Sequence, residues 1–225
     1  GTYFEYCNGA SSLLSALIGE TTGMCALAYA EQHLFSPLGI SDVNWPSNPQ
    51  GISIGWGELQ MRPHDLAKIG YLYLREGRWH GEQIVPVEWV QASTRAHIPA
   101  TLQDGYGYQW WVDDSGIYMA LGYAGQYIVV VPNEEMIVVF ASDLEENFFF
   151  LPRNLVNVFI IPAAESRTPL PANPDGVAEL EARTQALTQP YLRRVGKARG
   201  DMGGFLNELG ESQSSTIARC HLPKR

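Results

Sequence analysis

The sequence predicts an α+β domain in which helices come first along the chain and an antiparallel sheet follows. Before residue 95, apolar side chains recur at helical spacing. From residue 106 the chain changes to short extended runs separated by turns. With 225 residues, 45% of them apolar and 17% charged, the composition is that of a globular domain with one core. Helices followed by a sheet favour segregation of the two kinds of structure.

Four helices are expected in the first half of the chain. The first spans 9–19, begins just after Asn8 and ends at Gly19, and the second spans 24–35 before a Ser-Pro-Leu-Gly break. The third opens with Pro63 and runs to Gly77, and the fourth spans 87–94 after Pro86. Apolar residues recur at helical spacing in the first three of these helices. They are Leu13, Leu14, Leu17 and Ile18 in the first; Leu27, Tyr29, Ala30 and Leu34, which are expected to face inward, in the second; and the stripe Leu66, Ile69, Gly70, Tyr73 and Leu74 in the third.

Four extended runs predict an antiparallel meander. They cover 108–112, 116–121, 127–131 and 136–142, and Pro132-Asn133-Glu134-Glu135 makes the turn between the last two. The apolar segment 148–161, broken by Pro152, predicts a closing helix. We expect this helix to place Leu155, Val156, Phe159 and Ile160 against the sheet.

Charge and aromatic content indicate where this domain ends. The first 166 residues carry 6 basic and 18 acidic side chains, the remainder 9 and 6, and 23 of the 25 aromatic residues lie in the first part. Aromatic residues supply much of the buried area of a core, so the core belongs to residues 1–166. Residues 167–225 are expected to form a Pro-rich linker, one helix over 177–187 and a loosely ordered tail.

Composition argues against several functions. A net charge of −9 disfavours binding to nucleic acid, and no apolar run reaches the length of a membrane span. The three cysteines are widely spaced, and the five histidines form no pair on one helix face, so neither a metal site nor a disulfide framework is indicated. We expect no cofactor.

The order of several motifs carries a family resemblance. They are Tyr6-Cys7-Asn8 before a helix, residues 35–39 (FSPLG), residues 62–67 (RPHDLA), residues 107–111 (GYQWW), and residues 122–126 (GYAGQ) ahead of 129–132 (VVVP). A Tyr-x-Asn triplet alone is weak evidence, but the ordered set is much stronger. This order resembles the C-terminal part of the class C β-lactamase-related serine hydrolases, which include penicillin-binding carboxypeptidases, esterases and 6-aminohexanoate-dimer hydrolases. The resemblance covers about residues 3–166 and implies a β-lactamase/transpeptidase-like fold.

The resemblance implies acyl transfer through a serine ester, with Tyr6 and Asn8 in the catalytic machinery. In such enzymes a Ser-x-x-Lys helix presents the nucleophile, and the Lys and the Tyr of Tyr-x-Asn share removal of its proton. A phenol can do this only where a cation supports it. Asn8 would face the acyl side chain of the substrate or that Lys.

A strand at the edge of the site is the third family element. It maps to Ala120-Leu121-Gly122, with the backbone N–H of Tyr123 completing the oxyanion hole. β-Lactamases and carboxypeptidases commonly have Lys-Thr-Gly there, and the cation helps to hold a carboxylate. Ala120 and Leu121 offer no charge, so a small-molecule ester or amide is the expected substrate.

The chain contains no Ser-x-x-Lys, because Asp65, Arg194 and His221 stand three positions before its three lysines. The sequence also begins without an initiator Met, a basic start or an apolar signal segment. We therefore expect an N-terminally truncated hydrolase whose nucleophile lies upstream and which is inactive as the chain given. The alternative is a non-catalytic binding or interaction module that keeps the fold.

Simpler interpretations of the same residues remain open. Tyr6 could be a half-buried core phenol and Asn8 the N-cap of the first helix. Cys7 is more easily a small buried side chain than a thiol nucleophile, because no partner histidine is evident. Gly122 and Gly125 could serve only a tight backbone. Of Trp110 and Trp111, one should pack inward while the other could line a substrate cleft.

Overall fold

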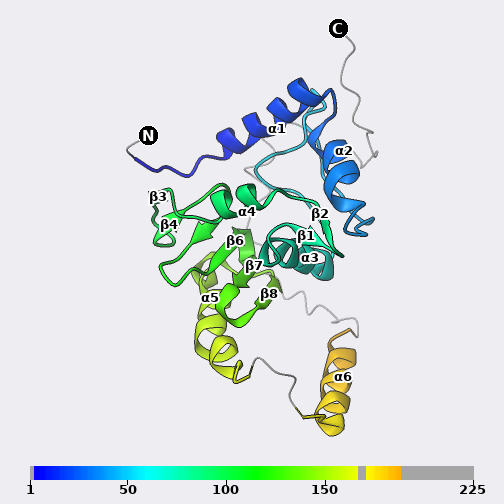
Figure 1. The fold of residues 1–225 in the computed structure, drawn as a ribbon, viewed down its shortest axis with the longest axis vertical. Coiled ribbons are helices and arrows are strands. Elements are labelled where there is room, and N and C mark those ends of the chain that lie inside the picture. The colour runs from blue at the N-terminus through cyan, green and yellow to red at the C-terminus, as the bar shows by residue number, and fades with distance from the viewer. Residues whose placement is uncertain (1–2, 167–170, 189–225) are drawn as a thin grey trace, which may run out of the picture. The chain divides into compact units, whose positions relative to one another are not determined.

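The computed structural model describes residues 3–166 and 171–188 (Figure 1). The chain divides into two compact units, the first containing the described residues up to Glu165 and the second beginning at Ser166. The predicted tail beyond residue 188 and part of the predicted linker lie outside the described residues. The division into a domain over 1–166 and a tail over 167–225 therefore stays a prediction.

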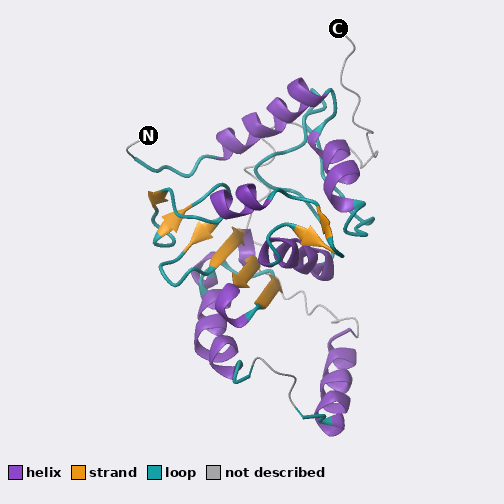
Figure 2. Cartoon of the chain, in the orientation of Figure 1, coloured by secondary structure: helices purple, strands orange, loops and turns teal. Residues whose placement is uncertain are grey.

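Helices occupy the first half of the first unit, as expected (Figure 2). The first helix, α1, runs past Gly19 and ends at Thr22, and it is capped by Gly23, whose φ of 71° is the left-handed conformation that glycine adopts most easily. The predicted end at Gly19 is therefore wrong. The second helix changes from α to π hydrogen bonding at Glu31. The helices are α1 (Asn8–Thr22), α2 (Ala26–Ala30) with η1 (Glu31–Phe35), α3 (Pro63–Leu74) and α4 (Val87–Ser93).

The second half forms an antiparallel sheet whose strands follow one another in chain order, which confirms the predicted meander. The predicted strand over 108–112 is shorter than expected, because Gln109 has a φ of 66° and turns the chain just before the strand. A separate two-stranded hairpin follows α3. Its strands are β1 (Arg78–Trp79) and β2 (Glu82–Gln83), and the sheet consists of β3 (Ile98–Pro99), β4 (Gly105–Tyr106), β5 (Trp111–Val112), β6 (Tyr118–Gly122), β7 (Gln126–Val131) and β8 (Met136–Ala141).

Side chains alternate across the sheet and build a core on each face. Met119, Tyr127 and Val129 point to one face and pack with Trp111 and Val156. The intervening residues point to the other face and pack against α3, forming the cluster Trp110, Val112, Tyr118, Ile128 and Val130. Figure 1 shows α3 and α5 (Leu151–Leu155) on opposite sides of these strands.

The closing segment is helical but does not pack as predicted. After η4 (Glu146–Phe148) and α5, the chain continues as η5 (Val156–Ile160) and η6 (Ile161–Ala163). Val156 is buried and Ile160 contacts the core, whereas Phe159 is 65% exposed and Leu155 is 36% exposed. The change from α to π hydrogen bonding at Val156 widens the turn and rotates the following side chains about the axis, so a simple helical spacing misplaces Phe159.

Helix α1 packs with its small polar face inward, and most of its leucines are exposed. Leu13, Leu14 and Leu17 are 51–66% exposed, while Ser11 and Ser15 are buried. The Ser15 hydroxyl donates to the Ser53 carbonyl at 2.7 Å. A Cβ on Gly55 would lie 2.2 Å from the Ser11 carbonyl oxygen, so the helix backbone sits directly on this loop.

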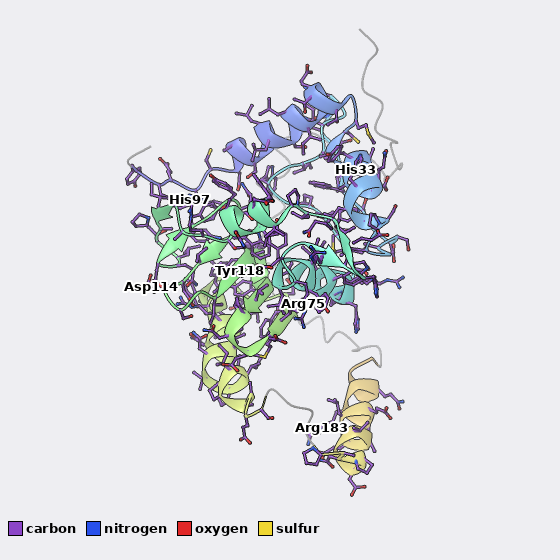
Figure 3. All side chains as sticks on the ribbon, in the orientation of Figure 1. His33, Arg75, His97, Asp114, Tyr118 and Arg183 are labelled. Atoms are coloured by element: carbon purple, nitrogen blue, oxygen red, sulfur yellow. The ribbon has the colours of Figure 1, made fainter. Side chains whose placement is uncertain are left out.

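In the second unit, α6 (Pro174–Thr188) includes the predicted helix over 177–187. The Asn173 side chain accepts from the Gly176 N–H at 2.9 Å and caps its start. Glu179 and Arg183 pair across one turn at 2.6 Å. Figure 3 labels Arg183 on this helix.

In the described ranges no single helix is long and apolar enough to cross a membrane. The helices Asn8–Thr22 and Ala26–Phe35, bent by 72° where they meet, satisfy the length and composition criteria only as a pair.

Replacing Gly55 by alanine should weaken the attachment of α1. The added Cβ meets backbone rather than a movable side chain, so we expect a loss of about 1–3 kcal/mol in the free energy of unfolding. Urea denaturation followed by circular dichroism measures this loss. Gly57→Ala is the matched control, because a Cβ there meets nothing within 4 Å. Equal stability of the two variants would contradict the close approach of α1 to Gly55.

Buried phenols should make the fold sensitive to alkali. Desolvation raises the pKa of Tyr106 and of Tyr127 from 10.0 to about 12, and it also raises the pKa of Tyr118. Unfolded phenols lose their protons near pH 10, so the unfolded state binds fewer protons than the folded state above that pH. The contribution of these phenols to stability should be fully present below pH 10 and decrease as the pH rises from about 10 to 12.

Denaturation midpoints measured across this pH range, with absorbance at 295 nm to follow phenolate, test the prediction. Tyr106→Phe should make the decline shallower, whereas Tyr29→Phe, at an exposed position, should leave it unchanged. Ionisation of all tyrosines near pH 10 without unfolding would refute it.

Candidate functional site

Two adjoining cavities, of about 920 and about 580 Å³, form one cleft between the start of the chain, the loop before α3 and the exposed end of the sheet. They share lining residues from all these segments: Tyr6, Glu58, Leu59, Trp111, Leu121 and Gly122. This size suits a small molecule. The larger cavity is lined by all four residues that the sequence singled out, namely Tyr6, Asn8, Gly122 and Tyr123.

Aromatic packing fixes the segment that carries Tyr6. The Tyr6 ring stacks on Trp111 with centroids 5.7 Å apart and planes inclined by 23°, and it meets Tyr106 edge-on at 6.3 Å. The Phe4 ring contacts both of these rings, with its centroid 4.9 Å from that of Tyr106 and 5.8 Å from that of Trp111. Tyr6 itself is 52% exposed, so it is a wall of the cleft rather than a core phenol.

Tyr106, the ring that Tyr6 meets edge-on, lines the same cleft and has a raised pKa. Burial is the main cause of its raised pKa of about 12, and the nearby Tyr6 phenol raises it further. Tyr106 therefore stays protonated across the physiological range.

Asn8 and Cys7 occupy positions other than the simpler interpretations gave them. The N-cap of α1 is Cys7, which makes no side-chain capping bond, so Asn8 is the first helical residue and the N-cap prediction for it is wrong. Cys7 is exposed rather than buried. The chain enters α1 in an extended conformation at Cys7, and the Asn8 carbonyl accepts from the Ser12 hydroxyl at 3.2 Å.

Gly122 and Tyr123 lie where β6 turns into β7. Gly122 pairs with Gln126, and a Cβ on it would lie 2.8 Å from the Gln126 carbonyl oxygen. Gly125 has a φ of 83°, and its side-chain position is crowded by Leu144, Ser142 and Pro152. Both glycines therefore meet a backbone requirement of this tight turn. The Tyr123 ring is 72% exposed at the mouth of the cleft.

The two neighbouring tryptophans divide between the faces of the sheet. Trp110 packs against Tyr73 of α3 with centroids 4.7 Å apart, and Trp111 lines the cleft. Both are buried, at 6% and 3% exposure, so Trp111 is a rigid floor rather than a mobile contact.

Three residues of the cleft that sequence reasoning did not single out share a left-handed backbone. Glu58, Gln109 and Ala124 have φ values of 61°, 66° and 57° and line one or both cavities. Such conformations cost energy in non-glycine residues and concentrate at functional sites. Gln109 also accepts from the Ser11 hydroxyl at 3.4 Å, which joins this loop to α1. Its place in the GYQWW motif was the one available signal.

The charge of the cleft is acidic. Glu58 and Asp143 contribute carboxylates, and none of the described residues lining either cavity is Lys, Arg or His. Over the same described residues, no group of three or more His, Cys, Asp or Glu could hold a metal ion. The described part of the cleft thus supplies phenol, amide and backbone groups but no cation.

Known proteins resemble this chain in sequence and in fold. The Beta-lactamase family model matches residues 1–159. An uncharacterized protein of Alkalihalophilus pseudofirmus is 26% identical over 174 residues, which cover 62% of this chain and 52% of that protein. The 6-aminohexanoate-dimer hydrolase of Paenarthrobacter ureafaciens is 23% identical over 149 residues, which cover 60% of this chain and 38% of the enzyme.

A solved structure shows the same fold. The "putative 6-aminohexanoate-dimer hydrolase" of Bacillus anthracis superposes with a TM-score of 0.63 at 23% identity, over 73% of this chain and 44% of that one. The chain therefore spans about half the length of the curated relatives that it matches, or less. Because the family model covers well over half of the sequence, the chain belongs to the β-lactamase family, is related to its serine hydrolases and has a β-lactamase/transpeptidase-like α+β fold.

Proposed function

We propose that this chain supplies part of a serine acyl-transfer site, and that the attacking serine and its lysine come from sequence outside the 225 residues. The carrying observation is that Tyr6, Asn8, Gly122 and Tyr123 line one cavity although more than a hundred residues separate the two pairs. Tyr6 and Asn8 were assigned to the site from one motif, and Gly122 and Tyr123 from another. Because the two pairs line the same cavity, each assignment supports the other. The absence of Ser-x-x-Lys from the sequence supports the second part of the proposal.

Tyr6 is the proton carrier in this proposal. The serine hydroxyl attacks the carbonyl carbon of an ester or amide, and its proton passes to the Tyr6–lysine pair. The tetrahedral oxyanion collapses, the C–O or C–N bond breaks, and the proton moves to the leaving alcohol or amine. Water then repeats the sequence on the acyl-enzyme and regenerates the serine. Stacking on Trp111 holds the Tyr6 ring in one orientation during these transfers.

A cation must be added before Tyr6 can act as a base. None of the described residues that line the cleft is a cation, and a phenol can take a proton from a hydroxyl only where a cation supports it. The lysine of a Ser-x-x-Lys helix would supply the missing charge. This electrostatic argument, together with the missing nucleophile, is why we propose that the chain alone is inactive.

The edge of the sheet favours a neutral substrate. Ala120, Leu121 and Gly122 line the cleft where other family members carry a lysine for a carboxylate, and the remaining walls include Leu59, Trp111 and Phe149. An apolar, acidic cleft disfavours anions. We therefore propose an uncharged ester or amide of small size. The Paenarthrobacter ureafaciens relative is named as a hydrolase of the 6-aminohexanoate dimer.

The test compares this chain with a longer polypeptide that adds the residues encoded before Gly1. The assay uses a chromogenic short-chain ester with and without a serine-reactive phosphonate. The chain alone should show no phosphonate-sensitive turnover, whereas the longer protein should turn over and be labelled at a Ser-x-x-Lys serine. In the longer protein, Tyr6→Phe should lower kcat about 10²- to 10⁴-fold, the usual contribution of a positioned acid–base group. Tyr29→Phe, which removes an exposed hydroxyl beside His33, should leave kcat unchanged.

Phosphonate-sensitive turnover by the 225-residue chain would overturn the proposed source of the nucleophile. A longer protein that is neither labelled nor active would instead support the alternative, a β-lactamase-like binding module that uses the cleft over Trp111.

A further inference from the structure

A separate cavity of about 760 Å³ lies beside α3. It is walled by α3, by the β1–β2 hairpin and by Ile137 of β8, and it shares no lining residue with the cleft. Its principal side chains are His64, Lys68, Tyr71, Arg75, Arg78 and Trp79. The α3 residues recur every three or four positions, so they form one continuous stripe along the helix.

The cavity concentrates positive charge in an acidic domain. Residues 3–166 contain only six Lys and Arg against 18 Asp and Glu, and three of those six, Lys68, Arg75 and Arg78, line this cavity together with His64 and His80. Figure 3 shows Arg75 beside α3 and the hairpin. A local excess of cations in a chain of net charge −9 indicates attraction for an anion.

Two of these cations are already partly neutralised. Lys68 Nζ lies 2.8 Å from Asp65 Oδ1 and donates to the Gly39 carbonyl at 3.0 Å. Arg75 Nη2 lies 3.5 Å from Glu135 Oε2, a loose pair with both side chains exposed. The Arg78 guanidinium makes no hydrogen bond or ion pair with any residue that the structure describes. The Arg78 guanidinium is therefore available to bind a ligand in this cavity.

Aromatic rings line the same cavity as Arg78. Trp79 meets Tyr71 edge-on at 5.8 Å and His80 edge-on at 4.9 Å, and the Arg75 guanidinium lies 5.3 Å from the centre of the Tyr71 ring. The hairpin holds them in place, because His80 and Gly81, with φ values of 47° and 88°, form a tight two-residue turn between paired Trp79 and Glu82.

We propose that this cavity binds a small aromatic carboxylate. The two carboxylate oxygens match the planar fork of Arg78, and the ring of the ligand packs against Trp79 and Tyr71. Asp65 and Glu135 pair with Lys68 and Arg75, so one uncommitted arginine is left at the cavity, and it suits one negative charge better than a dianion such as phosphate. The cavity volume lies within the range for small-molecule sites. This binding does not depend on the proposed hydrolytic function.

Calorimetric titration of the full chain with 1-naphthoate tests the proposal. We expect saturable binding at one site, with weaker binding of 1-naphthalenemethanol, which lacks the charge, and of acetate, which lacks the ring. Arg78→Gln should weaken naphthoate binding about tenfold or more, the loss expected for a charge-assisted hydrogen-bonded pair. Arg78→Lys keeps the charge but loses the planar guanidinium, so its affinity for naphthoate should lie between those of the unmodified chain and Arg78→Gln.

Arg95→Gln is the matched control, because Arg95 is exposed and lies outside this cavity, and it should leave the affinity unchanged. Unchanged affinity of Arg78→Gln, or equal weakening by Arg95→Gln, would overturn the site. Equal affinity for acetate would overturn recognition of the ring, and tighter binding of inorganic phosphate would overturn the preference for a monoanion.

Discussion

Burial of β7 on both of its faces is the constraint on which the rest of the first unit depends. Residues 127–131 are 0–7% exposed, with Tyr127 and Val129 in one core and Ile128 and Val130 in the other. Each such side chain contributes about 1.5–3 kcal/mol when removed from water. Helix α3 and the closing helical segment can cover the sheet only because β7 presents an apolar surface to both. Strand β6 pairs with β7 and ends at Gly122, which lines the cleft. The position of β7 therefore also fixes this edge of the cleft.

The sequence pattern predicts the sheet and α3 well because both obey simple rules. A strand buried on both faces reads as a continuous apolar run, and residues 127–131 are such a run. Helix α3 combines Pro63 at its first position with an apolar stripe that includes Leu66 and Ile69, and both contact the core. In these elements the local pattern and the tertiary environment agree.

Helix α1 shows where the pattern fails. Periodicity identifies an apolar stripe through Leu14 and Leu17, but it cannot say whether a neighbour lies on that side. Here the loop around Gly55 lies on the opposite side, and it requires small residues at Ser11 and Ser15. Backbone turns are a second limit. Glu58 and Gln109 line the cleft in left-handed backbone conformations. Neither glutamate nor glutamine favours a positive φ, so the sequence does not predict these conformations. The four residues assigned from the order of motifs meet in one cavity, whereas the backbone conformations of Glu58 and Gln109 could not be predicted, although Gln109 lies in the GYQWW motif.

The adjacency of Trp110 and Trp111 has a consequence for how the chain tolerates insertions. One indole belongs to the core beneath α3 and the next to the floor of the cleft, and only one peptide bond separates them. A one-residue insertion or deletion in the loop before β5 that moved the strand along its partners would exchange the two rings. The helix-facing core and the cleft would then be damaged together. In the loop before β5, changes of residue type should therefore be tolerated far more readily than changes of loop length.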